Sequence, residues 1–354
     1  MFVSIDGGKE WSQFTGNLPN VAVRDIAIHP REHDLILATH GRGVLIIDDI
    51  IPLRKLTADV LDKELVILEG RPNEMKIGGG FQEFSGGGNF VGSNPSDVAT
   101  ITYYQKDRHV FGDMKIEISD KNGKLISTIP AGKRKGINRI DWAIRLKAPK
   151  VAPGANVAGG AMIGPLVPEG TYTVKLLKGE KTYTGTINLV ADPLSTHSAA
   201  DRAMQSKAVL DLYDMQGNLA YIADAVTGVR DAATARAGKI DSTDALAIKL
   251  KAFAGKLDSL HKTLVATKEG GILVGEEQLR ERVVDLYGAI NSYGGKPTKS
   301  QLERMDAVSK ELTNSEKTFG SFVKTDLETL NAQLTAKKLP AITVITRAEF
   351  DKKD

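Results

Sequence analysis

The chain has 354 residues, of which 41% are apolar and 26% are charged. This length predicts about two or three domains, and the apolar content allows each of them to bury a core. Acidic and basic residues nearly balance, giving a formal net charge of +3, and they are spread along the chain, which argues against a nucleic-acid or anionic-membrane partner.

Two further features of the composition exclude whole classes of site. No cysteine is present, so disulfides, thiolate metal sites, iron–sulfur clusters and cysteine nucleophiles are excluded. No apolar run approaches the roughly 20 residues that a membrane helix needs, and we expect no membrane span. The first residues, MFVSIDGGKEW, do not have the pattern of a signal peptide. The sequence therefore predicts either a cytoplasmic protein or a chain whose own N-terminus is missing.

Residues 1–56 alternate short β-rich runs with turn residues, which predicts a sheet meander. The runs are residues 1–5, 21–29, 35–39 and 44–48. The first run starts the chain inside an expected strand, and a lone sheet of about four strands has two faces to cover. We therefore expect this region to pack against preceding β-structure of a parent protein.

Residues 57–193 continue the β pattern as short strands separated by turn signals. Two hairpins are predicted, formed by residues 114–119 with 124–129 and by residues 171–177 with 182–190. Asn122-Gly123 lies between the strands of the first hairpin, and this pair suits a tight turn. The pattern predicts an immunoglobulin-like β-sandwich.

Residues 194–354 change to a helical period after Asp192-Pro193. Apolar residues recur every three or four positions, as on one face of a helix. The apolar stripes lie within residues 212–229, 246–264, 279–290 and 302–322. Pro297-Thr298 marks the start of the last helix, and Gly294-Gly295 ends the one before it. The region therefore predicts an antiparallel bundle of about four helices.

One motif near the start carries specific information. Ser4, Asp6, Gly8 and Trp11 occupy all four fixed positions of the Asp-box pattern Ser/Thr-x-Asp-x-Gly-x-x-Trp. The Asp6 carboxylate can accept backbone N–H bonds in a tight turn, Gly8 permits the turn's backbone angles, and Trp11 can pack over the hairpin. These residue types stabilise a turn and supply no acid, base or nucleophile, so we expect a structural role for the box.

The motif resembles the boxes that decorate hairpins of sialidase-like and sortilin-like propellers. Val23-Arg24-Asp25-Ile26, Thr39-His40-Gly41-Arg42-Gly43 and Asp48-Asp49-Ile50 extend the likeness to the last blade of large bacterial BNR-repeat, sortilin-like proteins. Residues 164–174, GPLVPEGTYTV, resemble the final hairpin of an immunoglobulin-like module of the flagellar hook-cap type. The helical tail, with Lys296-Pro297-Thr298, resembles the C-terminus of the same proteins.

This resemblance implies a multidomain β plus α architecture. It consists of a partial β-propeller blade over residues 1–56, an immunoglobulin-like β-sandwich over residues 57–193 and an antiparallel helical bundle over residues 194–354. The resemblance also implies a periplasmic, outer-surface or extracellular location for the parent protein. Many such proteins are called glycosyl hydrolases on repeat similarity alone. A sialidase-type site draws its residues from several blades and cannot be assembled from about fifty residues.

Four residues are candidates for ligand binding. The glycines of Thr39-His40-Gly41-Arg42-Gly43 could present His40 and Arg42 to an anion or a sugar, although a purely structural turn is the favoured interpretation. Asp48 and Asp49 could bind a divalent cation, but neighbours on a strand point to opposite faces and give too few converging oxygens. His29 and His33 lack the third ligand of a zinc site and are interpreted as turn residues.

Glycine clusters at residues 78–80 and 86–88 fit neither a dinucleotide-binding nor a P-loop motif, and a mobile loop is expected there. We therefore predict no catalytic residue, metal or cofactor in this chain. The favoured function is a non-catalytic interaction or scaffold module that docks the upstream propeller blades and binds a protein or glycan. The alternative is a fragment of a glycoside hydrolase, or of another hydrolase, whose active site lies on upstream blades.

Overall fold

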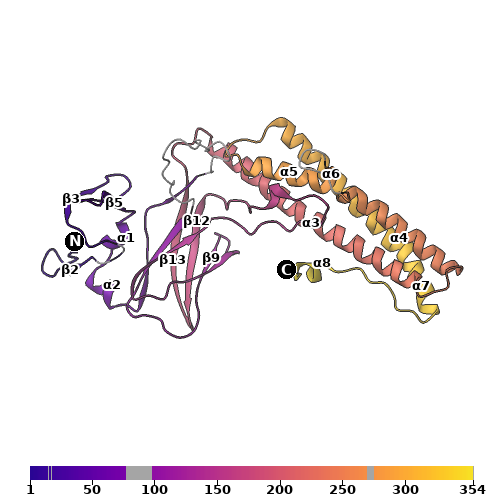
Figure 1. Ribbon diagram of the computed structural model, residues 1–354, viewed down its shortest axis with the longest axis horizontal. Coiled ribbons are helices and arrows are strands. Elements are labelled where there is room, and N and C mark those ends of the chain that lie inside the picture. The colour runs from indigo at the N-terminus through magenta and orange to yellow at the C-terminus, as the bar shows by residue number, and fades with distance from the viewer. Residues whose placement is uncertain (15, 17, 77–97, 269–274, 354) are drawn as a thin grey trace. The chain divides into compact units, whose positions relative to one another are not determined.

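The computed structural model describes residues 1–14, 16, 18–76, 98–268 and 275–353, and the protein has a mixed β and α fold (Figure 1). The glycine clusters predicted to form a mobile loop lie outside these residues. The chain divides into two compact units. The first comprises Met1–Leu146 with Val167–Ser195, and the second comprises Lys147–Leu166 with Thr196–Asp354. The predicted division into three regions stays a prediction.

The first unit begins with two small antiparallel sheets. Strands β1 (Phe2–Val3) and β2 (Ser12–Gln13) pair around the Asp-box turn. The second sheet has the order β3-β4-β5. Its strands are β3 (Val23–Ile28), β4 (Leu35–Thr39) and β5 (Val44–Ile47). Short helices α1 (Ile51–Arg54) and α2 (Ala58–Asp62) follow.

Two larger sheets form the rest of the first unit. One has the order β11-β8-β6 and the other the order β10-β9-β12-β13-β7. The strands are β6 (Leu65–Leu68), β7 (Asn73–Met75), β8 (Ala99–Gln105), β9 (Met114–Ser119), β10 (Leu125–Pro130), β11 (Gly136–Trp142), β12 (Gly170–Lys178) and β13 (Lys181–Ala191). The two hairpins predicted from the sequence are therefore confirmed.

The core of the first unit lies where side chains of the two larger sheets meet. Trp142 on β11 is buried and contacts Tyr172 on β12 edge to face, with ring centroids 5.3 Å apart, a favourable geometry for an aromatic pair. Gly185 on β13 faces Ile67 on β6 so closely that an added Cβ would lie 2.6 Å from its Cγ2 atom. Only glycine allows this approach of the two sheets.

The second unit is helical. Its elements are η2 (Gly159–Ala161), α3 (Ala199–Ala237), α4 (Ala245–Leu264), α5 (Leu279–Asn291), α6 (Lys299–Phe322), η3 (Val323–Leu327), α7 (Glu328–Ala336) and α8 (Arg347–Asp351). The predicted stripes of α3, α4 and α5 are buried in one shared hydrophobic core, to which α6 contributes Val308, Leu312 and Phe319. Thr298 caps α6 in a capping box with Gln301, which confirms the predicted start of this helix.

Residues 147–166, which the sequence groups with the β-rich region, pack against α5 in the helical unit. The Tyr287 hydroxyl donates a hydrogen bond to the Ile163 carbonyl at 2.7 Å. Gly160 lies against the backbone of α5, where an added Cβ would lie 2.5 Å from the Val284 carbonyl oxygen. The sequence pattern did not predict this packing, because the packing depends on contact between Gly160 and Gly288, which are 128 residues apart.

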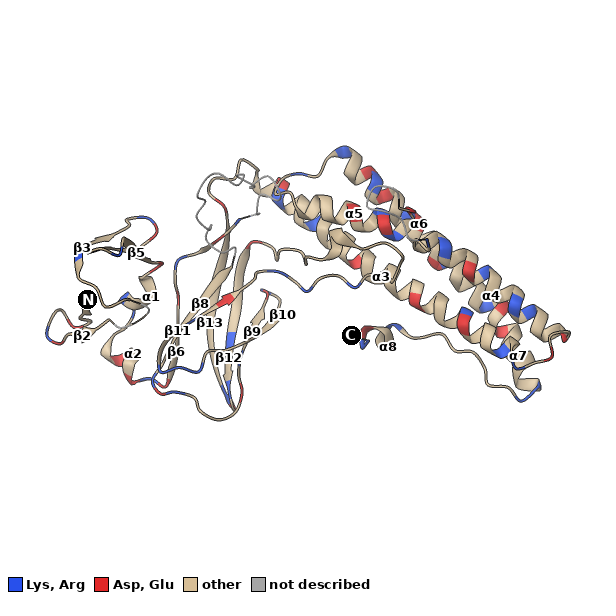
Figure 2. Ribbon diagram, viewed as in Figure 1, with Lys and Arg blue, Asp and Glu red and all other residues tan. Residues whose placement is uncertain are grey.

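Charged side chains cover the outer surface of the long helices. Figure 2 shows basic and acidic residues interspersed along α4 and α6. On α4, Lys262 pairs with Asp258 at 2.7 Å, one helical turn away, the spacing at which opposite charges support a helix. No helix in the described part of the chain is both long enough and apolar enough to span a membrane.

Candidate functional site

A group of interacting charged residues lies where the β3-β4-β5 sheet meets the connection between β6 and β7. We name this group the Asp49 junction and define it as Glu32, His33, Asp34, Asp49 and Arg71. Glu32, His33 and Asp34 come from the turn between β3 and β4, Asp49 follows β5, and Arg71 lies just before β7. The junction thus joins segments that lie far apart in the sequence.

Asp49 is the centre of the junction. Its backbone N–H donates to the Asp34 carboxylate at 2.9 Å, and its own carboxylate accepts the N–H groups of Ile51 at 3.1 Å and Arg71 at 2.9 Å. Its φ of 47° lies in the left-handed region, which aspartate tolerates better than most residues. An added Cβ on Gly70 would lie 2.4 Å from the Asp49 carboxylate. Glycine at position 70 is therefore required for this contact.

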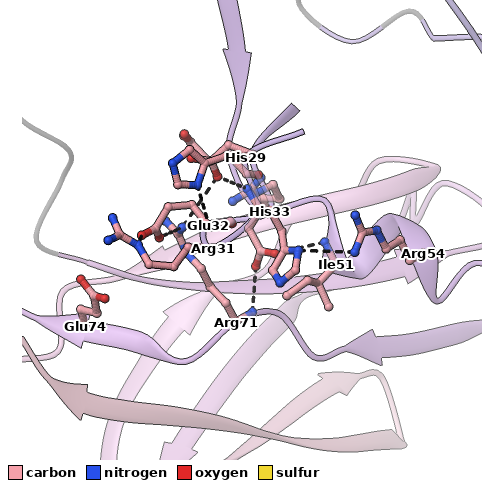
Figure 3. Close-up of polar contacts among 12 residues, drawn as sticks. His29, Arg31, Glu32, His33, Ile51, Arg54, Arg71 and Glu74 are labelled. Carbon is pink, nitrogen blue, oxygen red and sulfur yellow. Dashed lines mark hydrogen bonds and ion pairs between the residues drawn. The ribbon is translucent and has the colours of Figure 1, made fainter. Parts of the chain in front are cut away.

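Arg71 and Glu32 form the ionic part of the junction. The Arg71 guanidinium donates to both the carboxylate and the backbone carbonyl of Glu32 and lies 3.7 Å from the Asp34 carboxylate. Figure 3 shows Arg71 and Arg31 on either side of Glu32. The hydrogen bond from Arg31, followed by the nearby charge of Arg71, lowers the pKa of Glu32 below its ordinary value. Glu32 is therefore an ionised partner in this pair at neutral pH.

His33 completes the junction through its backbone. Its φ of 57° is also left-handed, and its carbonyl accepts the Ile50 N–H at 2.9 Å. Its Nδ1 lies 3.4 Å from the guanidinium of Arg54 on α1, as Figure 3 shows. Nearby, His29 Nδ1 accepts the Glu32 N–H at 3.0 Å. His29 therefore bonds within the turn, as its interpretation as a turn residue predicts, whereas His33 lies in the turn but links it to Ile50 and Arg54.

The chemistry of the junction is structural. The Asp34 and Asp49 carboxylates accept backbone N–H groups, and the Glu32 carboxylate is held by two arginines. Among the residues that the structure describes, no group of three or more histidine, aspartate or glutamate side chains is placed to hold a metal ion. The arrangement fixes the position of the β3-β4-β5 sheet on the neighbouring β-structure, because each carboxylate joins one segment to another.

The four predicted binding residues do not converge. His40 and Arg42 are exposed on the β4–β5 turn, where Gly41 and Gly43 have φ values of 78° and 72°. Asp48 and Asp49 lie at the other end of β5, whose four residues span roughly 13 Å of extended chain. Asp48 is exposed, and its carbonyl accepts a hydrogen bond from Arg139 at 2.6 Å. These residues form two separate places on the surface.

The Asp-box hairpin has the hydrogen bonds that the motif requires. The Asp6 carboxylate accepts the N–H groups of Lys9 at 3.0 Å and Glu10 at 3.1 Å, and the Ser4 hydroxyl donates to it at 2.7 Å. These bonds, with that from Glu10 the strongest, lower the pKa of Asp6. Trp11 donates its indole N–H to the Gly8 carbonyl at 3.1 Å. All four box residues therefore take part in one turn.

Sequence reasoning missed the most connected residues of the junction. Glu32 and Asp34 stand in the run HPREHD, which signals a polar turn and nothing more. Arg71 is 39 residues from Glu32, and no spacing rule links the two. Only Gly70, placed directly before Arg71, gives a local hint that another chain segment approaches closely.

Comparisons with known proteins found few similarities. No protein-family model matches the sequence, and no curated protein matches it. A biofilm-associated protein BSP domain is similar in structure, with a TM-score of 0.19 and 11% identity over 46% of this chain and 20% of that one. A point mutant of Salmonella alpha-2-macroglobulin gives a TM-score of 0.21 and 11% identity over 47% of this chain and 9% of that one. This chain thus spans a small part of either neighbour, and likenesses this weak support no conclusion about its function.

Proposed function

We propose that this chain is a non-catalytic interaction or scaffold module of a larger secreted, sortilin-like propeller protein, and that its β3-β4-β5 sheet docks against neighbouring propeller blades. The observation that carries the proposal is that this sheet exposes large apolar side chains on both of its faces. These are Ile26, Ile28, Val44 and Ile46. A sheet of this kind is typical of an inner layer with protein on either side.

The strand register assigns the exposed residues to faces. Ile26 is directly opposite Leu37, and Ile36 is directly opposite Ile46. Residues that are opposite one another share a face, and neighbours along a strand do not. Ile26, which is 52% exposed, therefore lies on one face, and Ile46, which is 58% exposed, lies on the other. Burying only one face would leave the other apolar surface in water.

The proposed occupant is the adjacent antiparallel sheet of a propeller blade, because apolar faces of twisted sheets pack against one another at about 10 Å. The Asp-box hairpin supports this choice. Phe2 and Trp11 are both exposed there, so the hairpin adds aromatic surface to the same N-terminal region. The likeness of residues 1–56 to a last propeller blade points to the same occupant.

We further propose that the two larger sheets form an immunoglobulin-like sandwich and that the helices of the second unit form an antiparallel bundle. We assign both to binding a protein or glycan partner outside the cytoplasm. The Asp49 junction would hold the blade on the sandwich, because its ion pairs and backbone hydrogen bonds link these two regions.

The test combines the coding sequence with hydrogen exchange. The reading frame upstream of Met1 should encode further Asp-box repeats and a signal peptide. When that upstream polypeptide is co-expressed with this chain, amide exchange in β3 and β5 should slow relative to the chain alone, while exchange in α3 stays unchanged. The proposal is wrong if the upstream frame encodes no such repeats, or if the upstream polypeptide does not protect β3 and β5.

A separate assay tests the alternative that the chain is a hydrolase. Sialyl, aryl-glycoside and peptide substrates should give no turnover above buffer. Two variants, His40→Ala and Asp48→Ala, each change an exposed residue at one of the two predicted binding positions. Saturable turnover that either substitution abolishes would contradict the non-catalytic function.

A further inference from the structure

One end of the first unit carries an exposed apolar tip that has no role in the proposed docking of the β3-β4-β5 sheet. The loop between β8 and β9 comprises residues 106–113. At its tip, Val110 is 65% exposed and Phe111 is 87% exposed. Gly112, with a φ of 82°, allows the chain to turn back directly after the tip. Two consecutive apolar side chains therefore project into water at the end of a β-sheet.

The neighbouring loop between β10 and β11, residues 131–135, supports the tip. The His109 N–H donates to the Lys133 carbonyl at 3.0 Å, and the Lys133 ammonium donates to the Gly112 carbonyl at 2.7 Å. These two bonds tie the loops together on both sides of Val110 and Phe111. The tip is consequently held in place before any partner arrives, which lowers the entropy that binding costs.

Buried side chains fix the backbone of the supporting loop. The Tyr103 hydroxyl donates to the Gly132 carbonyl at 2.5 Å, the Gln105 amide donates to the Lys133 carbonyl at 3.2 Å, and the Asn138 amide donates to the Arg134 carbonyl at 2.8 Å. Burial raises the pKa of Tyr103 to about 12, so this donor keeps its proton at neutral pH. The loop's carbonyls thus face inward, and Arg134 and Lys135 are exposed.

Positive charge surrounds the apolar tip. Residues 106–113 and 131–135 together contain five basic and two acidic residues, a local excess of three positive charges. The basic residues are Lys106, Arg108, Lys133, Arg134 and Lys135, and the acidic ones are Asp107 and Asp113. Lys106 is also paired with Asp62 at 3.2 Å, and counting this carboxylate leaves a local excess of two positive charges. Arg108, Arg134 and Lys135 remain as the exposed cations around Val110 and Phe111.

We propose that these two loops form a docking site for an anionic lipid surface, with Val110 and Phe111 entering the boundary between headgroups and acyl chains. We name residues 106–113 and 131–135 the basic finger. Interfacial binding scales with the apolar area that enters the membrane plus attraction to anionic headgroups. Arg108, Arg134 and Lys135 supply that attraction at the level of the headgroups, and the tip supplies the apolar area.

The shape of the basic finger favours a lipid surface over a folded protein. A folded partner would need a preformed pocket that matches two adjacent apolar side chains, whereas a fluid bilayer adapts to a convex tip. A double-stranded nucleic acid would use the cations and leave Phe111 in water, and a single strand that stacks a base on Phe111 would leave Val110 in water. An anionic surface with an apolar interior contacts both the exposed cations and the two apolar side chains of the tip.

This inference goes beyond the proposed function and does not depend on it. It also revises the expectation drawn from the balanced composition, which argued against an anionic membrane partner. That balance sums charge over the whole chain, whereas the fold gathers cations from two segments about 20 residues apart at one end of the β-structure.

The experiment is flotation of the purified full chain with vesicles of phosphatidylcholine alone and of phosphatidylcholine mixed with phosphatidylglycerol. The chain should float with the mixed vesicles, and added salt should release it. The partition coefficient should fall about ten-fold for Phe111→Ser and about five-fold for each charge removed in Arg134→Gln and Lys135→Gln. All three residues are exposed, so the variants should keep the melting temperature of the unmodified chain.

A matched control uses the hairpin at the opposite end of β9. Lys121, Lys124 and Leu125 are exposed there, so Lys121→Gln with Lys124→Gln and, separately, Leu125→Ser should leave flotation unchanged. The proposal fails if the chain floats equally with both kinds of vesicle or with neither, or if control and finger variants lose binding alike. Binding to a heparin column together with no flotation would also overturn it, since a polyanion without an apolar interior would then suffice.

Discussion

The carboxylate of Asp49 accepts the backbone N–H of Arg71, 22 residues along the chain, at 2.9 Å. The Arg71 side chain in turn donates to Glu32, 39 residues back in the sequence. One short segment thus bonds to two others, through its backbone to Asp49 and through its side chain to Glu32. This double attachment explains why the small β3-β4-β5 sheet has a defined place in the first unit despite its exposed apolar faces.

Replacing Asp49 should destabilise the first unit selectively. Asp49→Ala leaves the N–H groups of Ile51 and Arg71 without their acceptor, and we expect the free energy of unfolding to fall by about 2 kcal/mol. Both tryptophans, Trp11 and Trp142, belong to this unit, so tryptophan fluorescence in urea reports its unfolding.

The neighbouring residue provides the control for this substitution. Asp48 is exposed, and only its backbone carbonyl makes the bond to Arg139, so Asp48→Ala should change stability by less than about 0.5 kcal/mol. Equal losses for Asp48→Ala and Asp49→Ala would contradict the role assigned to the Asp49 carboxylate.

Adding a methyl group at Gly160 should destabilise the helical unit. The new Cβ of Gly160→Ala would lie 2.5 Å from the Val284 carbonyl oxygen on α5, and overpacking of this kind costs about 1–3 kcal/mol. Gly159 is the matched control, because no atom lies within 4 Å of its added Cβ. Urea unfolding followed by far-ultraviolet circular dichroism should separate the two variants. Similar midpoints for both would show that residues 147–166 do not pack closely on α5.

The sequence predicted what local periodicity and turn chemistry determine. Asn122-Gly123 marked a hairpin, and Thr298 marked the start of α6, because in each case the deciding contacts lie within a few residues. Ion pairs such as Arg71 with Glu32 were not predicted, since no local pattern encodes them. The packing of Gly160 on Gly288 was missed for the same reason, as was the meeting of two basic segments in the finger.

A pH dependence should arise from Glu64, just before β6. Hydrogen bonds from Lys181 and Lys178 lower the pKa of Glu64 from 4.5 to about 2. Because the folded-state pKa is the lower one, Glu64 stabilises the folded chain fully above about pH 4.5, and this contribution is lost as the pH falls toward about 2. The measurement is the fluorescence-monitored urea midpoint between about pH 6 and pH 3.

Glu64→Gln tests the origin of this pH dependence. The variant should lose stability near neutral pH and should show a flatter pH profile than the unmodified chain, since its amide does not titrate in this range. Glu180→Gln is the control, because Glu180 is an exposed carboxylate in the same turn as Lys181. A profile for Glu64→Gln that parallels the unmodified chain would assign the acid sensitivity to other carboxylates.

The buried ion pair of α5 gives the largest expected effect. Arg280 and Glu281 are 5% and 9% exposed, and the Arg280 guanidinium also donates to the carbonyls of Ala152 at 2.6 Å and Asn156 at 3.0 Å. Arg280→Ala would leave the Glu281 carboxylate buried without its counter-charge, and breaking a buried pair costs about 3–5 kcal/mol. The helical signal in circular dichroism should therefore melt at a much lower urea concentration, while tryptophan fluorescence from the first unit changes little.

Arg282 is the matched control for Arg280, two residues along the same helix. It pairs with Glu311 at 2.6 Å, but both side chains are about one third exposed, so Arg282→Ala should cost no more than about 1 kcal/mol. Comparable losses for the two variants would mean that the carbonyls of Ala152 and Asn156 do not depend on Arg280. A loss confined to Arg280→Ala, accompanied by faster amide exchange in residues 152–156, would identify Arg280 as the residue that fastens this segment to α5.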